Sequence, residues 1–124
     1  MNIIKIVTIL YSSLRLWVMK ITGKKVFYKN WLTISPRATL EVSNSGLLKI
    51  SQGLHMKDHS SLSVRPGAVI QIGAGVFINK HTIITARKKI QIGSGVTIGP
   101  NVCIFDHDHD LNNRGRLSEN SSLT

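Results

Sequence analysis

The chain has 124 residues, 42% of them apolar, so it is long enough for one folded domain and too apolar for a disordered chain. Its net charge is +10, and no Asp or Glu precedes Glu41. Such a basic surface favours anionic partners, but the chain has no nucleic-acid-binding motif and few aromatic residues for base stacking, which argues against nucleic acid.

Residues 1–30 predict a basic, amphipathic α-helical segment. The apolar residues recur at helical spacing and form one stripe: Ile3, Ile6, Val7, Leu10, Leu14, Trp17, Val18 and Ile21. Lys5, Ser12 and Arg15 interrupt the apolar run, so the segment does not resemble a transmembrane helix. It does not resemble a secretory signal either, because no small-residue cleavage site follows it.

Two interpretations of this helix are open. In the first, the helix packs on its own domain or on a neighbouring subunit. In the second, residues 1–25 lie in the plane of an anionic membrane, with Trp17 at the interface and Lys20, Lys24 and Lys25 facing the lipid. The basic tract that follows the helix slightly favours the second interpretation.

Residues 31–105 repeat with a period of six. An aliphatic residue opens each of the clearest units: Ile72, Ile78, Ile84, then, after a two-residue offset, Ile92, Ile98 and Ile104. A small or β-branched residue follows four positions later at Val76, Thr82, Val96 and Val102. This period does not fit a helix, but it fits a short strand followed by a turn. Three such units close a triangular coil, and stacked coils bury a column of aliphatic side chains.

Several polar and small residues of the repeat are expected at turns. These are Gly73, Gly75, Gly93, Gly95 and Gly99, for which positive φ costs little, Asn79 and Asn101, which tolerate it, and the exposed His55, His59 and His81. Arg87, Lys88 and Lys89 fall at the two-residue offset and predict a solvated corner, with phosphate or glycan contact as the alternative.

Cys103 is the only cysteine, which rules out a disulfide within the chain and favours a reducing compartment. It lies in the apolar repeat, where a buried, inert thiol is expected. Residues 106–124 have few apolar positions and predict an exposed loop and tail.

The repeat resembles the hexapeptide-repeat acyltransferase family over residues 34–110. The most specific stretch is IQIGSGVTIGPNVCIFDHDHD, which is similar to the sugar O-acetyltransferase branch: galactoside, maltose and nodulation-factor acetyltransferases and those of polysaccharide gene clusters. The resemblance implies a mainly β fold, a left-handed parallel β-helix, here with an N-terminal amphipathic α-helix. It also implies a homotrimer whose active sites lie between subunits.

The resemblance implies a catalytic histidine that follows the IGPNV unit. Counting from Pro100 gives His109, and the family's upstream asparagine corresponds to Asn79. His109 would act as general base on an acceptor hydroxyl, acetyl-CoA would be the cosubstrate, and Asn79 would hold the acceptor or the tetrahedral intermediate. Asp106 or Asp108 would orient an imidazole.

Two other interpretations of residues 106–110 remain open. One is a solvated polar loop. The other is a metal site containing His107 and His109, but no third distant ligand is evident, so no metal is predicted.

The resemblance also implies further hexapeptides that form much of the coenzyme A tunnel, whereas this sequence ends at Thr124 without them. We therefore expect a C-terminally truncated chain whose coenzyme-binding residues are unassigned. The expected function is O-acetylation of a sugar or glycan in surface polysaccharide biosynthesis, in the cytoplasm or at the inner membrane face. The alternatives are a non-catalytic β-helix with a structural or membrane role, and an acetyltransferase for an amine or antibiotic.

Overall fold

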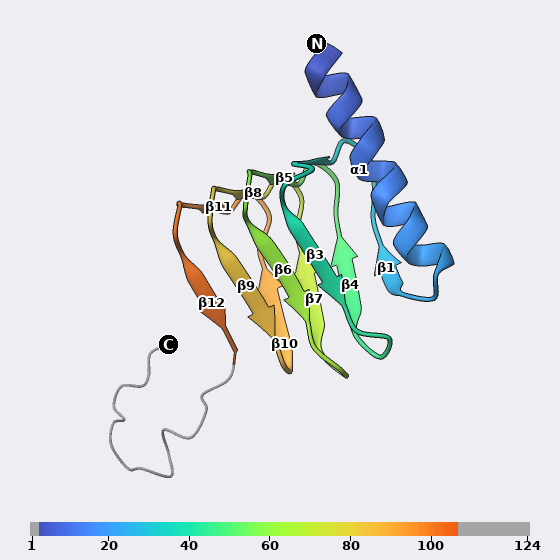
Figure 1. Ribbon diagram of the computed structural model, residues 1–124. Helices are drawn as coiled ribbons and strands as arrows, with labels where there is room; N and C mark the ends of the chain where they lie inside the picture. Colours follow the sequence, from blue (N-terminus) through green and yellow to red (C-terminus); the bar gives the residue numbers. More distant parts are fainter. Residues whose placement is uncertain (1–2, 107–124) are drawn as a thin grey trace.

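A computed structural model describes residues 3–106, which form a parallel β-helix with one α-helix at its N-terminal end (Figure 1). The helix is α1 (Ile3–Ile21). The strands are β1 (Lys25–Phe27), β2 (Thr33–Ile34), β3 (Thr39–Val42), β4 (Leu47–Ile50), β5 (His55–Met56), β6 (Ser61–Val64), β7 (Val69–Ile72), β8 (Phe77–Ile78), β9 (Ile83–Ala86), β10 (Lys89–Ile92), β11 (Thr97–Ile98) and β12 (Cys103–Phe105).

The strands form three parallel sheets, and each sheet takes one strand from every coil. Their orders are β1-β4-β7-β10, β2-β5-β8-β11 and β3-β6-β9-β12, so the solenoid has four coils. Each strand therefore pairs only with the coils before and after it, as Figure 1 shows. The predicted mainly β fold of stacked coils with an N-terminal helix is confirmed.

The coils differ in length at one corner. Leu48 pairs with Ile70 and Ile70 with Ile90, so the register advances by 22 residues and then by 20. Four residues join the third sheet to the first at 43–46 and at 65–68, but only residues 87 and 88 do so in the next coil. The two-residue offset in the sequence is this shorter corner.

Aliphatic side chains fill the interior of the coils. Ile72, Ile78, Ile92 and Ile98 are only 1%, 0%, 8% and 8% exposed and belong to one core, which confirms the predicted inward positions. Each fully buried aliphatic side chain contributes about 1.5–3 kcal/mol relative to an exposed one, so this column is the main source of stability.

Cys103 was predicted to be buried, and this prediction was wrong. Successive side chains of a strand point to opposite faces. Ile104 of β12 and Val102, just before the strand, pack against the core, so the thiol of Cys103 between them lies on the outer surface.

The glycine and asparagine residues expected at turns have a positive φ at some of these positions only. Gly75 and Gly95 have φ of 68° and 75°, and Asn101 has φ of 59°. Asn79 does not have a positive φ. Gly73 is needed for a different reason, because a Cβ there would lie 2.6 Å from the backbone nitrogen of Ser94 in the next coil.

Helix α1 covers the first coil with the side that carries Ser12, Arg15 and Leu16. The buried Ser12 hydroxyl accepts the N–H of Ile34 at 2.8 Å and donates to the carbonyl oxygens of Thr8 and Ile34. The Arg15 guanidinium donates to the carbonyl of Ser35 at 3.2 Å and also to that of Ala38. These bonds satisfy backbone groups at the free edge of the first coil.

The helix ends in a glycine C-cap. Gly23 has φ of 98°, its N–H bonds the carbonyl of Lys20, and the N–H of Lys24 bonds that of Met19, which is the Schellman pattern. Within residues 3–106, no helix combines the length and hydropathy needed to cross a membrane.

Candidate functional site

Asn79 lies at the corner between β8 and β9, directly after the last residue of β8. Its N–H donates to the carbonyl of Ile98 in the next coil at 3.0 Å. Its side-chain Oδ1 accepts the N–H of Lys80 at 2.8 Å, and the side chain is half-buried. The polar group left for a ligand is therefore the Nδ2 amide, which is a hydrogen-bond donor.

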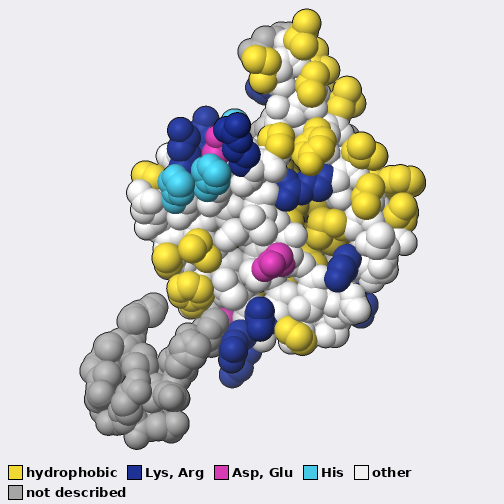
Figure 2. All heavy atoms as spheres, viewed as in Figure 1, with side chains coloured by type: hydrophobic (Ala, Val, Ile, Leu, Met, Phe, Trp, Pro, Cys, Tyr) yellow, Lys and Arg dark blue, Asp and Glu magenta, His cyan; other side chains and the backbone are white. Residues whose placement is uncertain are grey.

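The same corner recurs in the preceding coils, and we call these stacked turns the polar corner. It consists of residues 35–37, 57–59 and 79–81. Arg37, Lys57 and Lys80 supply three cationic side chains. Figure 2 shows Lys and Arg gathered with histidine around an acidic side chain on the face in view.

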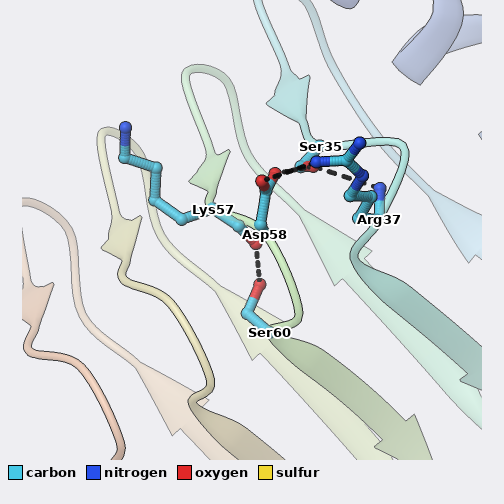
Figure 3. A network of polar contacts seen from close by, with 5 residues as sticks. All are labelled: Ser35, Arg37, Lys57, Asp58 and Ser60. Atoms are coloured by element: carbon cyan, nitrogen blue, oxygen red, sulfur yellow. Dashed lines mark hydrogen bonds and ion pairs between the residues drawn. The ribbon is translucent and has the colours of Figure 1, made fainter.

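Asp58 is the carboxylate within the polar corner. It accepts a hydrogen bond from the Ser35 hydroxyl and forms an ion pair with Arg37 at 3.6 Å (Figure 3). The bond from Ser35 is the largest effect that lowers the pKa of Asp58; desolvation opposes it, and Arg37, His59 and Lys80 lower it further. The corner holds one ionised carboxylate and three cations, Arg37, Lys57 and Lys80, so it has a net positive charge.

Two histidines stack in this corner. His59 and His81 have φ of 61° and 60°, and their rings are nearly parallel with centroids 5.2 Å apart. Both are exposed turn residues, as predicted. His55 is not in a turn, which corrects the prediction. It lies in β5, half-buried, with its ring 5.0 Å from that of Phe77.

Asp106 follows β12, and its carboxylate binds backbone amides that lie about one coil earlier in the chain. Its carboxylate accepts the N–H groups of Arg87, Lys88 and Lys89 at 2.7, 2.7 and 2.6 Å. The three basic side chains are exposed, which confirms the predicted corner, and their amides form a nest for an anion. The sequence signal for this contact is that Asp106 follows Ala86, the last residue of β9, by one 20-residue coil.

The structure does not bring Asn79 and Asp106 together within one chain. Asn79 precedes β9 and Asp106 binds just beyond its end, so the strand separates them by about 13 Å. His109, His107 and Asp108 lie outside the described residues. Among residues 3–106, no three His, Cys, Asp or Glu residues lie close enough to hold a metal ion.

A cleft of about 440 Å³ lies beside the C-terminal ends of β3 and β6, but it does not contain the predicted site. Its lining includes Met19, Lys24, Glu41 and Arg65, and neither Asn79 nor Asp106. We therefore place the candidate site at the polar corner, where hydrogen bonds hold the functional groups, and not at this cleft.

Comparisons of the chain with protein-family models, with curated proteins and with solved structures found no match. The fold therefore rests on the coil register and the buried columns described above.

Proposed function

We propose that the protein transfers an acetyl group from acetyl-CoA to a hydroxyl of a sugar or glycan used in surface polysaccharide assembly. The single observation that carries the proposal is the state of the Asn79 amide. Its Oδ1 is engaged by Lys80, so Nδ2 offers donors to a developing oxyanion. The stacked hexapeptide coils and the IGPNVCIFDHDHD stretch support the same assignment.

The proposed reaction begins with attack of the sugar oxygen on the thioester carbonyl. His109, with a pKa suited to neutral pH, accepts the hydroxyl proton as the new C–O bond forms. Asn79 donates to the oxyanion of the tetrahedral intermediate. The C–S bond then breaks, coenzyme A leaves as a thiolate and takes the proton, and the sugar ester is released.

The arrangement favours a site shared by neighbouring chains. Asn79 lies at one end of β9, and the segment that leads to His109 begins beside the other end, at Asp106. We therefore infer that the histidine of one chain works with the asparagine of the next in a homotrimer. The threefold symmetry then gives an equivalent site at each boundary between chains.

Two substitutions at Asn79 test the donor role. Asn79→Asp keeps an oxygen that can accept the Lys80 N–H but loses the amide donors and adds a negative charge. Asn79→Ala loses both. We expect both variants to lose about 100-fold or more in coenzyme A release with a sugar acceptor, as for removal of an oxyanion donor. Only Asn79→Ala should also disturb the turn. Full activity of Asn79→Asp would remove Asn79 from catalysis.

The base is tested with His109→Ala and a matched control, His55→Gln, at a histidine of β5 outside the polar corner. The control keeps a polar side chain at this half-buried position. Thiol release from acetyl-CoA should fall with His109→Ala and persist with His55→Gln. Equal rates for wild type and His109→Ala would contradict the proposed base. Transfer to amines but not to sugars would replace the proposed acceptor.

A further inference from the structure

The outward face of α1 is apolar. Ten of its large hydrophobic side chains are exposed by 42% or more: Ile3, Ile4, Ile6, Val7, Leu10, Tyr11, Leu14, Trp17, Val18 and Ile21. Figure 2 shows hydrophobic side chains along the helix. We call this set the apolar helix face.

This face is the reverse of the usual arrangement. A helix on a protein surface normally buries its apolar stripe and exposes its polar side. Here Ser12 and Arg15 hydrogen-bond to the first coil and Leu16 is buried, so the side of the helix that carries these residues is fixed against the solenoid. The apolar stripe is therefore held outward.

A second feature of the same end of the molecule is Trp31. It lies between β1 and β2, two strands that α1 contacts, and is 61% exposed. Its φ is 64°, and the equivalent places in the later coils hold Gly53, Gly75 and Gly95. A large indole stands where the backbone favours glycine, and tryptophan is typical of membrane–water interfaces.

The charge around this face selects its partner. Before Glu41 the sequence contains seven basic residues and no acidic one. Arg15 hydrogen-bonds to the solenoid and Arg37 pairs with Asp58, and the other five are Lys5, Lys20, Lys24, Lys25 and Lys29. Two copies of the chain that met through the apolar helix face would bring these like charges together, which is unfavourable. An anionic lipid surface accepts both the apolar side chains and the cations.

We propose that α1 lies in the headgroup plane of an anionic bilayer, with the apolar helix face and Trp31 inserted and the flanking lysines on the lipid phosphates. The bonds of Ser12 and Arg15 keep the solenoid on the aqueous side of the helix. This inference is independent of the proposed acetyl transfer.

The test uses the full chain and its intrinsic fluorescence, because both of its tryptophans, Trp17 and Trp31, belong to the proposed contact surface. Vesicles of phosphatidylcholine with phosphatidylglycerol should shift the emission to the blue and sediment the protein. Pure phosphatidylcholine should bind it at least about tenfold more weakly, given roughly 1 kcal/mol for each basic residue near an anionic surface. Equal binding to both vesicles, or no blue shift, would overturn the proposal.

A double variant, Leu10→Gln with Leu14→Gln, tests the face itself. Both side chains are exposed, so their replacement leaves no cavity in the core. The matched control is Ile83→Gln on β9, which replaces an apolar side chain that is 40% exposed away from the helix. Vesicle binding should be lost in the double variant and kept in the control; loss in neither, or in both, would count against the proposal.

Two further measurements keep the outcome clear. Acyl chains brominated near the headgroup should quench the tryptophan emission of the wild-type protein, without any substitution at the face. Light scattering of the double variant tests the alternative, in which a second copy of the chain covers the apolar helix face. If the substitution converts an oligomer into monomers and the wild type ignores vesicles, the apolar helix face is an interface between copies and the membrane proposal is wrong.

Discussion

Trp31 and Gly53 occupy the same place in successive coils, and both have left-handed backbone conformations, with φ of 64° and 79°. The pairing of Thr33 with His55 fixes this register, since both pairs are 22 residues apart. A left-handed conformation costs an L-residue about 1–2 kcal/mol, and glycine avoids this cost. The first coil therefore carries strain at a position that glycine relieves in the others.

Replacement of Trp31 by glycine should stabilise the fold. The indole is exposed, so its loss removes little buried surface, and we expect the free energy of unfolding to rise by about 1 kcal/mol. Urea denaturation followed by circular dichroism measures the change. Trp31→Ala is the control, because it removes the indole but keeps the Cβ that causes the strain. Equal stability of the two variants would show that backbone strain is not the cause.

Ser12 should be the most sensitive polar residue of α1. Its hydroxyl is fully buried and is the acceptor for the N–H of Ile34. Ser12→Ala leaves that N–H without its partner beneath the helix, which costs about 1–3 kcal/mol. Ser13→Ala, one position along the same helix, is the control and should change stability by less than about 0.5 kcal/mol. Thermal unfolding of both variants tests the difference, and a Ser12→Ala protein as stable as wild type would show that α1 is not fastened there.

The core of the solenoid was predictable from the sequence, because the period of six places Ile72 and Ile78 in the interior regardless of the length of the corners. The orientation of α1 was not predictable. The apolar stripe was visible, but a stripe alone suggests a buried face, and only the bonds from Ser12 and Arg15 show that the other side packs. The outward position of Cys103 was also missed, because inward and outward strand positions differ by one residue.

The candidate site was predictable in part. Asn79 lies at a corner, but the stacking that adds Lys57 and Asp58 to the same surface depends on a 22-residue register. The sequence shows a spacing of six more readily than one of 22, because the corners vary in length. For the same reason, the contact of Asp106 with the shortened corner at residues 87 and 88 was not foreseen.

Asp106 should stabilise the last described coil through that corner. Its two carboxylate oxygens accept three backbone N–H groups, from Arg87, Lys88 and Lys89. Bonds to a charged acceptor are worth about 1.5–3 kcal/mol, so Asp106→Ala should lower the free energy of unfolding by about 2 kcal/mol. Asp106→Asn keeps one acceptor oxygen and should cost about half as much.

Hydrogen exchange locates the effect of Asp106. The amides of residues 87–89 should lose protection in Asp106→Ala, while those of β4 in the second coil should stay protected as in wild type. Unchanged exchange at residues 87–89 would contradict the structural role of the carboxylate, whatever the change in global stability.

His55 should make the fold sensitive to mild acid. Burial is the main effect that lowers the pKa of its imidazole below the ordinary value of 6.5, and the nearby Lys57 and Lys5 lower it further. The unfolded chain therefore binds the proton more tightly than the folded one. The resulting stability is fully present above pH 6.5 and is lost as the pH falls from 6.5 through the folded-state pKa.

His55→Gln removes this contribution, so the free energy of unfolding should fall less than in wild type between about pH 7.5 and 5. His81→Asn keeps His55 and should retain the wild-type fall from this group. Urea midpoints across this range measure both, and a His55→Gln protein whose stability still falls as steeply as wild type would show that the acid sensitivity arises elsewhere.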